Sequence, residues 1–91
     1  MINVSELPTE KEVRESIESA LKAARKAVKK NPAAMLGYAI GYSEFYLNNG
    51  LEYITDIGRI QILYILNNLQ TWKGAEARKV KIILRAVSLT M

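Results

Sequence analysis

Between residues 10 and 30, apolar side chains recur at intervals of three or four positions among charged residues. The apolar positions are Val13, Ile17, Ala20, Leu21, Ala24 and Val28. This spacing predicts an amphipathic helix with one buried face. Thr9 followed by Glu12 has the pattern of a capping box, which places the helix start at residue 10. Glutamates gather near the beginning of the segment and lysines near its end, an order that complements the helix dipole.

The segment 32–48 is apolar on almost all sides, and Glu44 is its only charged residue. Pro32 suits the first turn of a helix. A helix that is apolar all round is buried on more than one side. Gly37 and Gly41 lie four residues apart, which predicts a neighbouring helix at close range. The segment is too short and too rich in tyrosine for a membrane span.

Two more amphipathic segments are predicted, at 56–72 and 75–88. The first has an apolar face formed by Gly58, Ile62, Ile65, Leu66, Leu69 and Trp72. The second has a stripe formed by Ala77, Val80, Ile83, Leu84 and Val87. Thr55 or Asp56 caps the first segment, and Gly74 suits the turn between the two. The isoleucine-rich centre of the first segment also fits a strand, but the wider periodicity favours a helix.

The predicted fold class is therefore all-α, a compact four-helix bundle with helices at about 10–30, 32–48, 56–72 and 75–88. A chain of 91 residues is expected to form a single helical domain, 1–91, with 1–8 as an N-terminal extension. Its first residues lack the pattern of a signal peptide, so a cytoplasmic location is expected. Frequent isoleucine, lysine and glutamate without cysteine indicate a thermophilic source.

The residue types restrict the chemistry. The chain has no cysteine and no histidine, which excludes disulfides, thiolate zinc sites and imidazole bases or ligands. No serine stands in a nucleophile elbow, and no acidic residues have the spacing of a calcium loop. We therefore expect a protein that is not an enzyme, with no catalytic residue, no metal, no cofactor and no small-molecule substrate.

Aromatic residues supply the first candidate site. The expected interface with a protein partner consists of Tyr38, Tyr42, Phe45, Tyr46 and Trp72. A bundle of this size has little interior for the apolar residues of 32–48 and 56–72, so the excess predicts a protein partner or self-association. Two alternatives stay open. The tyrosines could cover the edge of the core with their hydroxyls in water, and Trp72 could be a core residue.

Basic residues supply the second candidate site. Contact with nucleic acid or an acidic partner is expected from Lys73, Arg78, Lys79, Lys81 and Arg85. The net charge of +4 permits such a partner. The last two helices could read DNA in the manner of a helix-turn-helix, although Gln70 falls where that motif needs a small residue. An ordinary solvated face is the other explanation.

The segment ILNNLQTWKGAEARKVKIIL (65–84), together with the small size and basic charge, resembles small helical accessory subunits of the crenarchaeal B-family replicative DNA polymerase. Small helical subunits of CRISPR effector complexes resemble the chain in the same general features of small size and helical structure. The resemblance implies an archaeal, non-catalytic protein that binds the polymerase, with the DNA backbone as a further contact. It assigns no site residues.

Together these features predict a helical interaction subunit that binds a larger protein in a nucleic-acid-handling complex. The alternatives are a small DNA-binding regulator and a homo-oligomeric structural protein without a nucleic-acid role.

Overall fold

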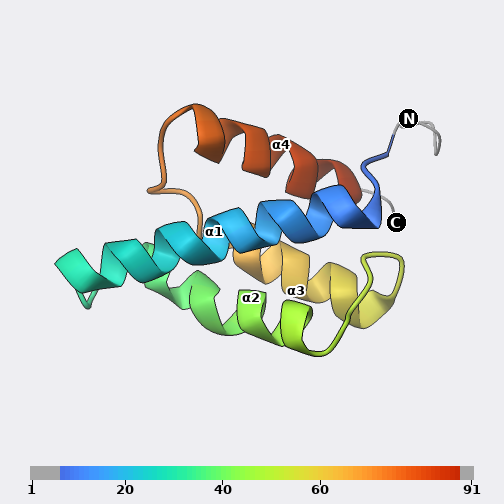
Figure 1. Cartoon of the computed structure of the whole chain (residues 1–91), viewed down its shortest axis with the longest axis horizontal. Coiled ribbons are helices and arrows are strands. Elements are labelled where there is room, and N and C mark those ends of the chain that lie inside the picture. Colours follow the sequence, from blue (N-terminus) through green and yellow to red (C-terminus); the bar gives the residue numbers. More distant parts are fainter. Residues whose placement is uncertain (1–6, 89–91) are drawn as a thin grey trace.

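The structure is a computed structural model that describes residues 7–88, which form a bundle of four α-helices (Figure 1). The elements are α1 (Glu10–Lys30), the 3₁₀ helix η2 (Met35–Tyr38), α2 (Ala39–Asn48), α3 (Asp56–Asn67) and α4 (Ala75–Ser88). No strand occurs within residues 7–88. The all-α, four-helix prediction is therefore confirmed.

Successive helices run in opposite directions, as the colour gradient in Figure 1 shows. Each helix packs on its neighbours along the chain, and α4 packs back on α1 to close the bundle. Short connections favour this up-and-down arrangement because they bring consecutive helices together as antiparallel neighbours. None of the helices between residues 7 and 88 combines the length and the apolar content that a bilayer-spanning helix needs.

The core lies between the four helices. Its buried residues are Val13, Ile17, Ala20 and Ala24 from α1, Leu36 from η2, Ala39 and Tyr46 from α2, Ile62 and Ile65 from α3, Leu69 from the following connection, and Val80, Leu84 and Val87 from α4. The stripes predicted for α1 and α4 supply most of this set, because their apolar residues occupy one side of each helix. The fully buried Tyr46 is the largest side chain among them.

Side-chain caps define where α1 and α3 begin. The hydroxyl of Thr9 accepts a hydrogen bond from the backbone N–H of Glu12 at 3.1 Å, and the backbone N–H of Thr9 donates to the Glu12 carboxylate at 2.8 Å. The predicted capping box is therefore confirmed. At α3, Thr55 is the cap, since its hydroxyl accepts from the backbone N–H of Gly58 at 3.0 Å, and Asp56 is the first helical residue.

The second helix begins later than predicted. Residues 32–34 form a turn and 35–38 a single 3₁₀ segment, so the prediction of a helix from residue 32 was wrong. The side chain of Asn31 accepts a hydrogen bond from the backbone N–H of Ala33 at 3.1 Å, and its backbone carbonyl accepts from Ala34 at 2.9 Å. An asparagine that binds the following backbone favours a turn over a helix.

The third helix ends earlier than predicted, at Asn67 instead of residue 72. The amide side chain of Asn68 donates to the backbone carbonyl of Tyr64 at 2.8 Å. This bond satisfies a carbonyl at the helix end, which allows the chain to leave the helix. Leu69 and Trp72 still pack on the core. The apolar spacing of the third helix therefore continued past its end because these two residues are buried from the connection that follows.

The two glycines of the second segment have different surroundings. A Cβ atom at Gly37 would collide with the side chain of Val28 on α1, which confirms a close helix approach at this position. Gly41 is exposed, and nothing lies within 4 Å of where its Cβ would be. The prediction of a close approach at Gly41 was therefore wrong, because this glycine faces away from α1.

Candidate functional site

The exposed side of η2, α2 and α3 carries several large apolar side chains. We call this surface the aromatic face; its residues are Tyr38, Tyr42, Phe45, Ile57, Ile60 and Tyr64. On each segment these residues recur at intervals of three or four positions, so they share one side of each helix. The rings of Tyr42 and Tyr64 pack against each other across the two helices, with centroids 5.0 Å apart and planes tilted by 43°. Because α2 and α3 are packed neighbours, the two rows form one surface.

A shallow hollow lies in this face, between η2 and α2 on one side and Gln61 of α3 on the other. It is lined by Tyr38, Gly41, Tyr42, Phe45 and Gln61. Gly41 has no side chain, so the hollow opens between three aromatic rings, and none of its lining residues is charged. A concave apolar spot between rigid rings is suited to an inserted side chain from another protein.

Tyr46 does not belong to this face. It is fully buried, and its hydroxyl donates a hydrogen bond to the Glu10 carboxylate at 2.7 Å. The guanidinium of Arg14 lies 5.8 Å from the ring centre. Burial, the hydrogen bond to Glu10 and the charge of Glu10 raise the pKa of the Tyr46 phenol above its ordinary value. The prediction that Tyr46 contacts a partner was wrong, because the α2 register turns it inward beside Ala39 and Ser43.

Trp72 also lies apart from the aromatic face. It follows α3 in the connection to α4, is half-buried and packs against the core. Its backbone carbonyl accepts a hydrogen bond from the Lys81 ammonium at 2.7 Å. A small hollow beside the indole is lined by Lys73, Gly74, Ala77, Arg78 and Lys81. The structure therefore places Trp72 at the core edge beside basic residues, and Trp72 does not line the hollow formed by Tyr38, Tyr42 and Phe45.

Three members of the aromatic face were not among the predicted site residues. Ile57, Ile60 and Tyr64 are exposed by 58%, 42% and 45%, respectively. Their spacing in the sequence indicates a second apolar patch on the third helix, outside its main buried stripe. Only the packing of α3 against α2 shows that this patch adjoins the tyrosines.

Four of the five predicted basic residues gather around the start and one side of α4. We call this the basic face; it consists of Lys73, Arg78, Lys81 and Arg85. Within residues 7–88, carboxylates pair with Arg14, Arg25 and Arg59 and with no residue of the basic face. Partial burial, with Lys73 and Arg85 nearby, lowers the pKa of the Lys81 ammonium. Repulsion among these cations means that an anion bound here would relieve unfavourable charge.

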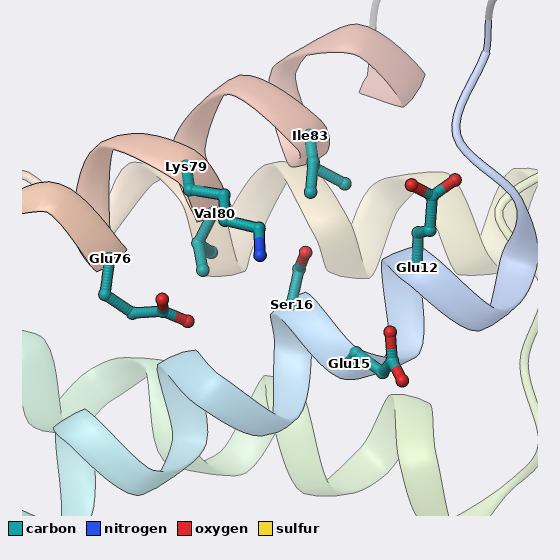
Figure 2. A pocket seen from close by; sticks show the side chains of 7 residues that line it. All are labelled: Glu12, Glu15, Ser16, Glu76, Lys79, Val80 and Ile83. Atoms are coloured by element: carbon teal, nitrogen blue, oxygen red, sulfur yellow. The ribbon is translucent and has the colours of Figure 1, made fainter.

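Lys79 points in a different direction. Figure 2 shows its ammonium directed into a small hollow between α1 and α4, with Glu12, Glu15 and Glu76 around it. It lies next to Val80 in the helix, about 100° around the axis from the Arg78 position. Lys79 is therefore separated from the basic face, and it faces acidic groups of its own chain.

In the hollow of Figure 2, α1 and α4 bring a serine, three carboxylates and a lysine together. The buried Ser16 makes no hydrogen bond to a carboxylate or to Lys79 in the described structure, so no arrangement of nucleophile and base is present there. Ser19 instead donates to Glu76 at 2.7 Å, which ties α1 to α4. No cluster of metal-ligating side chains occurs among residues 7–88.

The α3–α4 pair lacks the geometry of a helix-turn-helix. That motif joins its two helices by a turn of about three or four residues and sets them at a wide angle. Here the connection extends over residues 68–74, and α3 and α4 pack as antiparallel neighbours in a bundle. The core residue Leu69 and the half-buried Trp72 occupy this connection. The predicted use of these helices as a helix-turn-helix therefore does not fit the structure.

The fold and its surface define an all-α helical bundle with one aromatic face and one basic face. Comparisons with protein-family models, with curated proteins and with solved structures found no match for the chain.

Proposed function

We propose that this protein is a non-catalytic helical interaction subunit that binds a larger protein in a nucleic-acid-handling complex, such as a DNA polymerase holoenzyme. The observation that carries the proposal is the aromatic face. It is exposed on the folded chain, it extends over neighbouring helices, and it contains the tilted pair Tyr42 and Tyr64. Tyrosine and other aromatic residues dominate the energetics of protein interfaces.

The exposed area of this face sets the scale of the free energy that its burial can supply. Its four aromatic side chains are 70%, 36%, 45% and 45% exposed. A buried aromatic residue contributes roughly 150–250 Å². A partner that covers these four rings would thus remove on the order of 300–500 Å² from water, before the isoleucines are counted. At about 25 cal/mol per Å² this is on the order of 10 kcal/mol, which is comparable to the entropic cost of association.

The basic face supports an additional contact with phosphate. Its four cations have no carboxylate partner within residues 7–88, and phosphate contacts of this kind need no sequence reading. α4 packs on α1 and α3, while the aromatic face extends over α2 and α3. The two surfaces are therefore carried by different helices, and one molecule can engage a protein and a phosphate backbone together.

The proposal is tested by quantitative capture from an extract of the source cells. The double variant Tyr42→Gln/Phe45→Gln should lose a stoichiometric partner that the wild-type protein retains. With the purified partner, we expect an affinity loss of about 30-fold or more, because truncating central aromatic anchors costs about 2 kcal/mol or more. Ile82→Gln is the matched control, since Ile82 is 59% exposed on α4, outside the aromatic face. Equal retention by all three proteins would contradict the proposal.

A second copy of this chain is the alternative occupant of the aromatic face. The lining residues of its hollow are uncharged, so two copies could meet there without burying a charge. Sedimentation velocity over a wide concentration range separates the two cases. If the wild-type protein forms a dimer and Tyr42→Gln/Phe45→Gln does not, a second copy of the chain is the partner that covers the aromatic face. If the wild-type protein is a monomer, the face is available to another protein.

A further inference from the structure

A groove outside both faces runs along the C-terminal half of α1. It is lined by Glu18, Leu21, Lys22, Arg25, Lys26 and Lys29 of α1 and by Leu47 of α2, and its volume is about 530 Å³. We call it the lysine groove. It shares no residue with the aromatic face, the basic face or the hollow of Figure 2.

The helical repeat of α1 produces the charged wall of the groove. Lys22, Lys26 and Lys29 are spaced by four and three residues, so they form one line on the helix surface. From Glu18 to Lys29 the helix rises by roughly 16 Å at about 1.5 Å per residue. This length corresponds to about three turns of a second helix laid alongside α1.

The remaining lining residues give the groove an apolar strip and fix one wall. Leu21 is buried and Leu47 is half-buried between α1 and α2. Arg25 is tied to Glu44 of α2 at 2.6 Å, which neutralises its charge and joins the two helices. Lys22, Lys26 and Lys29 form no ion pair within residues 7–88, and Glu18 is the one carboxylate among the lining residues, so the groove carries a net positive charge.

We propose that the lysine groove binds an acidic amphipathic helix of a partner protein. A helix of this kind would place apolar side chains along Leu21 and Leu47 and carboxylates against the three lysines, which is the helix-in-groove mode of recognition. Its charge is complementary to the groove and its length matches three turns. A nucleic-acid backbone fits less well, because every phosphate is negative while Glu18 lines one end and Glu44 lies beside the wall.

The test measures fluorescence anisotropy of a labelled three-turn peptide with leucines on one face and glutamates on the flanks, titrated at low salt with the 91-residue chain. Wild-type protein should bind this peptide more tightly than a scrambled peptide of identical composition, because only the first is amphipathic. The triple variant Lys22→Gln/Lys26→Gln/Lys29→Gln should bind about tenfold more weakly, since each exposed pair contributes a fraction of this loss.

Two further variants distinguish binding in the groove from non-specific electrostatic attraction and from an effect of unfolding. Lys73→Gln/Arg78→Gln/Arg85→Gln removes the same number of charges from the basic face and should leave peptide affinity within about twofold. Glu18→Gln removes the carboxylate at the groove end and should tighten binding by about twofold, a gain that unfolding cannot produce. Equal affinity for the scrambled peptide, or a loss in the basic-face variant equal to that in the groove variant, would overturn the proposal. Displacement of the peptide from the groove by a DNA oligonucleotide at lower concentration than by unlabelled peptide would assign the groove to nucleic acid instead.

The inference does not depend on the proposed function. The groove variants leave the aromatic face intact, so loss of peptide binding and loss of the captured partner are measured with different proteins.

Discussion

Whether a residue in this bundle is buried or exposed depends on the side of its helix on which it lies. Phe45 and Tyr46 are adjacent and both aromatic, yet Phe45 is 45% exposed and Tyr46 is fully buried. Glu10 explains why a phenol is tolerated in the core. Its carboxylate accepts from the Tyr46 hydroxyl at 2.7 Å and from the backbone N–H of Tyr53 at 3.1 Å. Tyr46 thus links α2 to the start of α1 as a satisfied polar group.

The raised pKa of Tyr46 predicts that the folded protein loses stability at alkaline pH. Its pKa in the folded protein lies above the ordinary value of 10.0, so the folded state keeps the phenol proton after the unfolded chain has lost it. The contribution is complete below pH 10.0 and declines as the pH rises further, because deprotonation then favours the unfolded chain.

The measurement is thermal unfolding at several pH values between about 8 and 11.5, the range around the phenol pKa. Tyr46→Phe should lower stability at neutral pH by about 1–3 kcal/mol, since a buried hydrogen bond to a charged group is lost. It should also flatten the alkaline decline relative to the wild-type protein. Tyr38→Phe is the control, because Tyr38 is 70% exposed and should change neither quantity. Parallel alkaline curves for the wild-type protein and Tyr46→Phe would contradict the role of Tyr46.

Elements differ in how far local sequence determines them. The bounds of α1 and α4 agree with the predicted ranges 10–30 and 75–88, because each has one clear apolar stripe, and the capping box of α1 and the glycine before α4 mark where the two helices begin. The second segment is apolar nearly all round, so periodicity could not show where its helix begins. Asn31 and the close contact of Gly37 with α1 decide that η2 precedes α2.

Alanine substitutions at Gly37 and Gly41 are predicted to change the stability of the protein in opposite directions. Gly37→Ala should destabilise the protein by about 1–3 kcal/mol, because its Cβ would collide with the stiff side chain of Val28. Gly41→Ala should stabilise it by roughly 0.5–1 kcal/mol, because this exposed helical glycine has open space around it. Urea titrations of both variants measure the difference. If both substitutions shift stability in the same direction, the assignment of close approach to Gly37 alone is incorrect.

The whole molecule separates apolar surface from positive charge. Apart from Arg59, its basic residues lie in α1, α4 and the connection before α4, while the aromatic face covers α2 and α3. The ion pairs within residues 7–88 are short-range or exposed pairs that contribute little to stability. The excess positive charge on α1 and α4 is therefore a cost of the folded state, and bound anions would reduce it.

This charge distribution predicts that moderate salt raises the melting temperature. Between about 20 and 300 mM NaCl, screening should weaken repulsion among the lysines of α1 and among the cations of the basic face. We expect an increase of a few degrees, since like-charge pairs cost about 0.2–0.5 kcal/mol each. The Lys22→Gln/Lys26→Gln/Lys29→Gln variant should show a smaller increase. A melting temperature that falls with salt in the wild-type protein would contradict this account.

The sequence alone determined the helical class, because apolar periodicity, caps and turn glycines are local properties that each segment carries. It also identified the basic residues of the last helix and the tyrosines as candidate surfaces. Only the tertiary structure decided which of these residues share a surface. In the structure Tyr46 is buried, Trp72 lies at the edge of the core, and Lys79 lies apart from the basic face. The rings of Tyr42 and Tyr64 are in contact across two helices. The physical reason is that a surface shared by two helices depends on their relative rotation and register, which are set by core packing between segments distant in the chain.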